Sequence, residues 1–144
     1  MDMARGGALR LLSGVRDGLS LSDQAGALKA LPPADQARAG RLAGAVLRHQ
    51  SRADAVIAGH VSRKPSPQVA DILRLAVVEM LDLGGAAHGV VDAAVTLTRG
   101  LGQKGQAASG MVNAAAKAHS IRASSAHSGS SGYSAEIVSG KSAP

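Results

Sequence analysis

The fold of this chain is decided by residues 64–85, KPSPQVADILRLAVVEMLDLGG. The two prolines at its start favour an extended turn, and Pro67 suits the first turn of a following helix. Apolar residues then recur at helical spacing over more than half of the helix circumference, which is typical of a buried helix. Gly84 and Gly85 end the pattern as a C-terminal cap. The stretch therefore predicts a central helix over residues 67–83.

Apolar residues with helical spacing continue on both sides of this central helix. The residues from Ser20 to Asp23 suit the start of a short helix whose inward side chains are Ala25, Leu28 and Leu31. No stretch alternates convincingly with a period of two, so no strand is expected. The sequence thus predicts an all-α domain over residues 1–118. Its seven helices are expected at residues 4–17, 22–31, 34–49, 53–62, 67–83, 88–99 and 106–118.

The composition changes at His119. Nine of the 26 residues from 119 to 144 are Ser and three are Gly. Such a segment lacks the apolar side chains that would offset the entropy of ordering it, so a disordered tail is expected over residues 119–144. Residues 128–132, SGSSG, resemble an engineered linker, which suggests that part of this tail is not native.

The composition also excludes several classes of function. The 144-residue chain has no Cys, which excludes a disulfide framework, a Cys-ligated metal site and a cysteine nucleophile within it. Tyr133 is its one aromatic residue among Phe, Trp and Tyr, which argues against modules that stack bases on aromatic rings. The longest strictly apolar run has four residues, 75–78, too short to span a bilayer. We expect a soluble, cytoplasmic protein that does not enter a membrane.

Catalytic and metal-binding motifs are weak. Residues 100–105, GLGQKG, match the spacing of a dinucleotide-binding loop, but a helix and not a strand precedes them. A flexible loop between helices is the better interpretation, although Lys104 lies where it could contact a phosphate. The five His residues lack metal-binding spacing, so no metal is expected. Asp23, Asp35 and Asp54 are interpreted as helix caps, and no catalytic site is predicted.

The basic residues are more informative. The chain carries 16 Lys and Arg against 10 Asp and Glu, for a formal net charge of +6. Arginines at offsets 0, 3, 10 and 14 from Arg38 fall near one helix face, and such a face suits contacts to nucleic-acid phosphates. A solvated face that only keeps the protein soluble would explain the charge equally well. The candidate RNA-binding residues are Arg5, Arg10, Arg38, Arg41, Arg48, Arg52, Lys64 and Lys104.

Four motifs occur in an order that matches a known family. They are AGRLAGAVLRH at residues 39–49, KPSPQVADILRL at 64–75, HGVVDAAVTL at 88–97 and GMVNA at 110–114. Together they resemble the helices of the NusB-like family over about residues 4–116. The resemblance implies a seven-helix fold of two sub-bundles that binds RNA. It also places Arg5 and Arg10 in the arginine-rich segment implicated in RNA contact.

Within this family, the chain is most similar to the N-terminal domain of a bacterial 16S rRNA (cytosine-5) methyltransferase. Residues 47–49, the His88 motif and Ala114 carry this similarity. It implies a truncated, non-catalytic domain that docks rRNA and itself binds no cofactor. Methylation would then use S-adenosylmethionine and a cysteine nucleophile in a separate catalytic domain, which is one expected protein partner.

Two other functions remain open. The first is that of a free NusB-type antitermination factor, which would bind RNA and a ribosomal protein. The second is that of a helical protein-interaction bundle without RNA binding.

Overall fold

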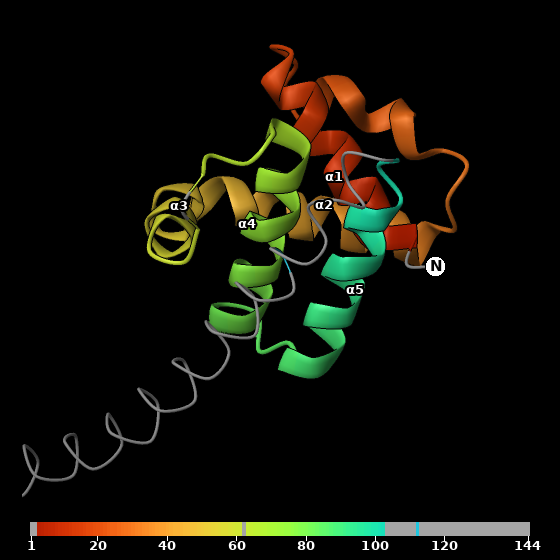
Figure 1. The fold of residues 1–144 in the computed structure, drawn as a ribbon. Coiled ribbons are helices and arrows are strands. Elements are labelled where there is room, and N and C mark those ends of the chain that lie inside the picture. Colours follow the sequence, from red (N-terminus) through yellow and green to blue (C-terminus); the bar gives the residue numbers. More distant parts are fainter. Residues whose placement is uncertain (1–2, 62, 103–111, 113–144) are drawn as a thin grey trace, which may run out of the picture.

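The chain folds as a bundle of helices around one core. The computed structural model describes residues 3–61, 63–102 and 112, and these contain no strand (Figure 1). The all-α prediction is therefore confirmed. The elements are α1 (Met3–Arg16), the 3-10 helix η1 (Ser22–Leu28), α2 (Pro33–Arg48), α3 (Gln50–Ala58), α4 (Pro67–Leu81) and α5 (Ala87–Arg99).

The last two predicted segments fall on residues that are mostly not described. Val112, within the predicted helix over residues 106–118, is helical and fully buried against the core. The rest of that helix, Lys104 and the predicted tail over residues 119–144 lie outside the described residues.

Helix α4 is the centre of the bundle and contacts α1, α2, α3 and α5 (Figure 1). It begins as predicted, with Pro67 in its first turn and the hydroxyl of Ser66 accepting from the backbone N–H of Val69 at 3.4 Å. It ends at Leu81, two residues earlier than predicted. The chain turns back at Gly84, whose φ of 66° suits a residue without a side chain. Residues from every turn of α4 are buried, which explains its continuous apolar pattern.

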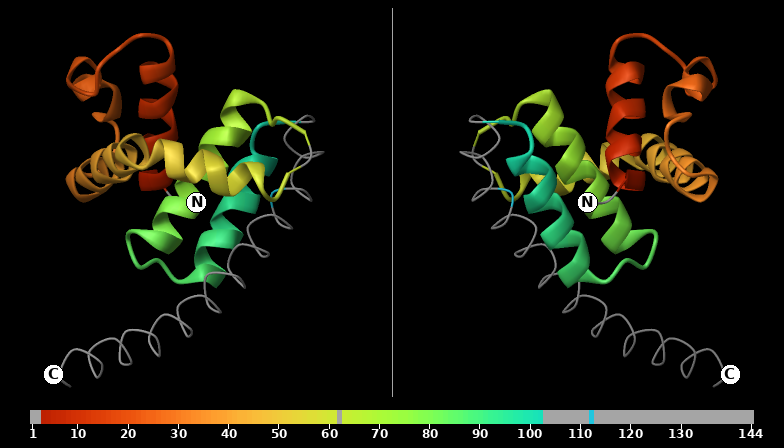
Figure 2. Two further views of the ribbon diagram at one scale, coloured as in Figure 1. Left: turned by 90° about the vertical axis from the view of Figure 1, so that its left-hand side faces the viewer. Right: turned by 90° about the vertical axis from the view of Figure 1, so that its right-hand side faces the viewer.

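The other helices lie on two sides of the molecule. Figure 2 shows α1 and η1 on one side and α4 and α5 on the other, with α2 and α3 crossing between them. Helix α1 packs mainly on α2, and Gly7 permits this close approach. A Cβ on Gly7 would lie 3.0 Å from Cδ1 of Leu31 and 3.1 Å from Cβ of Ala39. This arrangement agrees with two sub-bundles, and one continuous cluster of buried side chains joins them.

The predicted helix over residues 22–31 is present but is shorter and of the 3-10 type, and its predicted buried face is right at Leu28 and wrong at Ala25. The segment is a 3-10 helix that ends at Leu28, and Ala25 is exposed while Gln24 is buried. The Gln24 amide explains the difference, because its Nε2 donates to the backbone oxygen of Leu11 at 3.1 Å across the side-chain-free Gly14. The predicted cap is confirmed, since Ser20 and Asp23 exchange two hydrogen bonds of 3.0 Å between their backbone N–H groups and side chains.

Helix α3 is displaced from its predicted position over residues 53–62. It begins at Gln50 and ends at Ala58, so only His49 separates it from α2. The displacement changes the role of Asp54, which lies in the middle of α3 and is not a helix cap.

Candidate nucleic-acid interface

A buried carboxylate on the central helix α4 joins it to α1 and α2. Glu79 of α4 is 5% exposed and accepts two hydrogen bonds from Arg5 of α1. The bond from Nε to Oε2 is 2.8 Å long and that from Nη2 to Oε1 is 2.9 Å long. Arg38 of α2 approaches the same carboxylate, with its Nη2 3.7 Å from Oε1. Glu79 therefore links α1 and α2 to the central helix. The guanidinium of Arg5 is engaged in this ion pair through two hydrogen bonds.

A second ion-pair network joins α1, α3 and α4. Asp71 is 7% exposed and accepts from Arg16 of α1 and, at 2.9 Å, from Arg74. Arg74 also donates from Nε to Asp54 of α3 at 2.6 Å. Burial opposes the charge of Arg74, but its hydrogen bonds and charge pairing with Asp54 and Asp71 raise its pKa above the ordinary value. These arginines are therefore held by structural contacts between helices.

One further predicted arginine is paired at the surface. Arg52, near the start of α3, donates to Asp82 at the end of α4. The guanidinium is half exposed, so this pair contributes only modestly to stability.

The arginines on α2 are different. Arg41 and Arg48 are exposed, and no acidic side chain in the described part of the chain pairs with either. They are seven residues apart, so they lie on the same side of the helix about 10 Å apart along its axis. Arg38 lies beside them at the edge of the buried face and is 41% exposed. We call Arg38, Arg41 and Arg48 the α2 basic face.

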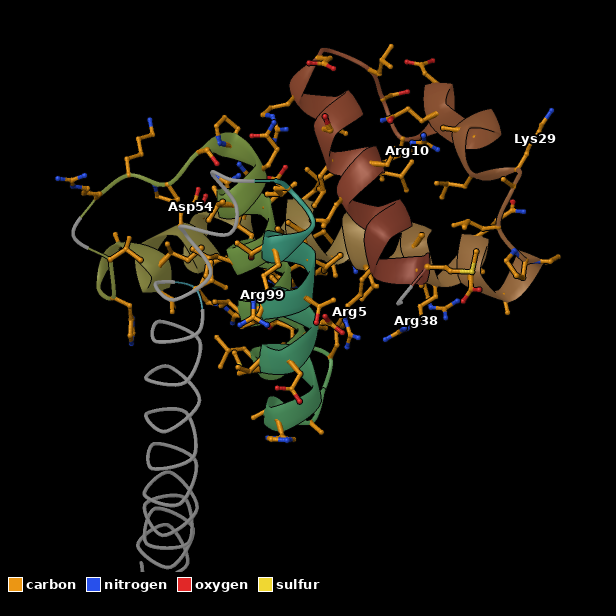
Figure 3. The ribbon with its side chains drawn as sticks, turned by 45° about the vertical axis from the view of Figure 1, so that its right-hand side comes forward. Arg5, Arg10, Lys29, Arg38, Asp54 and Arg99 are labelled. Atoms are coloured by element: carbon orange, nitrogen blue, oxygen red, sulfur yellow. The ribbon has the colours of Figure 1, made fainter. Side chains whose placement is uncertain are left out.

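The structure separates the two predicted arginines of α1. Arg5 points toward α4, whereas the Arg10 guanidinium lies against η1 and donates to the backbone oxygen of Ala27 at 3.2 Å. Figure 3 shows Arg10 toward Lys29 and Arg5 toward Arg38. The seven candidates that the structure describes therefore do not form one patch: three form the α2 basic face, and Lys64 lies apart in the turn before α4.

Sequence reasoning missed a cavity beside that turn. It has a volume of about 650 Å³ and lies between α3, residues 63–65 before α4, the start of α4 and the end of α1. Arg63 and Asp54 are among its lining residues, and neither was a candidate for binding. The i, i+3 spacing of Asp71 and Arg74 signals one ion pair on α4. No local pattern signals the cavity, because it depends on how α3 packs against α4.

Other kinds of site are not evident in the described residues. Within residues 3–61, 63–102 and 112, no three His, Asp or Glu side chains gather as metal ligands would. None of the helices described is long and apolar enough to cross a membrane.

The described residues therefore form a bundle of helices in which α2 presents an exposed row of arginines to the solvent. The NusB family matches residues 3–115, most of the sequence, and the chain belongs to the NusB family. No curated protein and no solved structure shows a significant match to it.

Proposed function

We propose that this domain binds RNA and that the α2 basic face is its main contact surface. The observation that carries the proposal is the exposure of Arg41 and Arg48 on one side of α2, with no acidic partner within the described residues. Phosphates that pair with such arginines release condensed counterions, which favours binding. NusB-family proteins generally bind RNA, and this supports the same function here.

The shape of α2 also supports a contact with the phosphate backbone. Gly44 lies between Arg41 and Arg48, and the position that its Cβ would take is 3.7 Å from Nη1 of Arg48. At Gly40, one turn earlier, no atom outside the local helix backbone lies within 4 Å of that position. The Arg48 guanidinium therefore lies over Gly44, about one turn along the helix from Arg41, so that both arginines can contact one phosphate backbone.

We further propose that the RNA is small-subunit rRNA. The support is the resemblance of residues 47–49, the His88 motif and Ala114 to a 16S rRNA (cytosine-5) methyltransferase. In that role the domain would position rRNA for a separate catalytic domain, which would supply S-adenosylmethionine binding and the cysteine nucleophile. The basic side chains of this domain would hold the RNA and take no part in the methyl transfer.

A comparison of variants tests the proposal. Filter binding with 16S rRNA fragments should show that Arg41→Ala/Arg48→Ala weakens binding by about tenfold, equivalent to roughly 1.4 kcal/mol. Lys29→Ala/Arg99→Ala is the matched control, because it also removes two exposed basic side chains, neither of which belongs to α2 (Figure 3). Equal affinities for all three proteins, with unchanged helical circular dichroism, would contradict the proposed surface.

The choice of RNA tests the finer proposal separately. The domain should bind a 16S rRNA fragment more tightly than an antitermination RNA of equal length. The reverse preference would favour a free antitermination factor and would contradict the rRNA-docking role.

A further inference from the structure

The cavity beside the α3–α4 turn has the size of a ligand site and an apolar interior. Its volume of about 650 Å³ falls within the range of small-molecule pockets. Ile57 and Val61 line it from α3 and the following turn, and Pro65 and Pro67 line it from the proline turn. Flat apolar surfaces such as proline rings suit the face of a planar ring. The cavity can therefore accept the planar part of a ligand.

The charges around the cavity favour an anion at its edge. Four basic side chains and one acidic side chain line it. Arg16 and Arg74 are engaged by Asp71 and Asp54. Arg63 and Lys64, by contrast, are exposed and have no acidic partner in the described part of the chain. These two adjacent cations are suited to bind one phosphate group.

The remaining polar groups suit the edge and the face of a nucleobase. Asp54 is 44% exposed, and its two oxygens accept from Arg74 at 2.6 and 3.3 Å. Each carboxylate oxygen has two lone pairs, so Asp54 can also accept from an amino group. Carboxylates accept from the cytosine amino group in this way. The guanidinium of Arg74 is held by two carboxylates, and such planar groups stack on unstacked RNA bases.

We infer that this cavity binds one unstacked nucleotide of a single-stranded RNA segment. The phosphate lies on Arg63 and Lys64, and the base enters the cavity toward Asp54. A base with an amino group is preferred over uracil, because uracil carries carbonyl oxygens on both sides of its one N–H donor at that edge. The inference rests on the proposed RNA binding and adds a second, base-sensitive contact to the phosphate contacts of the α2 basic face.

Methyl NMR with short single-stranded RNAs tests this inference. Ile57 lines the cavity and Ile72 is buried in the core, so their methyl signals report on the site and on the remainder of the fold. A short RNA of cytidines only should shift the Ile57 signal and leave that of Ile72 in place. An RNA of uridines only should bind at least several-fold more weakly at this site. Inorganic phosphate alone should leave the Ile57 signal in place.

Substitutions of Arg63 and Lys64 test whether RNA binding at the cavity depends on these two basic side chains. Arg63→Ala/Lys64→Ala should weaken the binding of the cytidine RNA by about tenfold. The control, Lys29→Ala, removes an exposed lysine on the opposite side of the molecule from Asp54 (Figure 3) and should have no effect on the Ile57 shift.

The outcomes separate this inference from the proposed function. If the wild-type protein binds 16S rRNA but no RNA shifts the Ile57 signal, the nucleotide site is refuted and the α2 basic face is unaffected. Equal shifts with cytidine RNA and inorganic phosphate would also refute it, because the cavity would then be a simple anion site. If no RNA binds under any condition, both the proposed function and this inference are wrong.

Discussion

The Glu79 carboxylate provides a stringent test of the interpretation of the arginines. We expect Glu79→Gln to lower the free energy of unfolding by about 3 kcal/mol, since breaking one side of a buried ion pair costs about 3–5 kcal/mol. The lower end applies because Arg5 is 15% exposed and the amide oxygen of Gln still accepts one hydrogen bond. With an unfolding entropy of about 2.1 cal/mol/K per residue over residues 3–115, the melting temperature should fall by roughly 13 °C.

Urea unfolding followed by helical circular dichroism measures this change. The dependence of the free energy on urea should keep the same slope, since the folded surface changes little. The control is Arg5→Met/Glu79→Leu, which replaces the pair with apolar side chains and should regain most of the lost stability. If Glu79→Gln stays within about 0.5 kcal/mol of the wild type, or the double variant is as unstable as the single one, the carboxylate does not hold the helices together.

Three other substitutions test the account of α1 and η1. Gly6→Ala should stabilise the protein by about 1 kcal/mol, because Gly6 lies at an exposed position of α1 and no atom outside the local helix backbone lies within 4 Å of the added Cβ. Gly14→Ala should destabilise it despite the same gain in helix propensity, because the Cβ would overlap the hydrogen-bonded Gln24 amide, and thermal melts that rank the variants in the opposite order would contradict this packing. The backbone and side chain of Ser20 lower the pKa of Asp23 below its ordinary value of 3.8, so this carboxylate stabilises the fold above that pH. The stability difference between wild type and Asp23→Asn should therefore shrink as the pH falls from about 5 to 2 through the lowered pKa, and a constant difference would show that the charge does not matter.

The sequence predicts the helices well where burial is continuous. The start of α4 at Pro67 follows from its proline turn and apolar pattern, and its end is displaced by two residues. Prediction is weaker where one long-range contact decides the outcome. The burial of Gln24 depends on a carbonyl of α1 and on the absent side chain of Gly14, and neither is visible in the pattern of residues 22–31.

The candidate site is predictable to a similar extent. Helical spacing alone places Arg41 and Arg48 on one exposed side, because both belong to the same helix. Helical spacing cannot show that Arg5 forms an ion pair with Glu79, since the two residues are 74 positions apart in the sequence. The same holds for Asp54 and Arg74, whose contact forms the cavity wall only once α3 packs on α4. The sequence therefore identifies basic residues, and the fold determines which of them remain available to a ligand.

The salt dependence of RNA binding tests the central claim most directly. Filter binding of a single-stranded 16S rRNA fragment, measured over a series of salt concentrations, should give a linear fall of log affinity with log salt. Removing two phosphate contacts with Arg41→Ala/Arg48→Ala should make the slope shallower by about 1.4, at about 0.7 per contact. An unchanged slope in this variant, or no binding by the wild type at low salt, would contradict RNA docking on the α2 basic face.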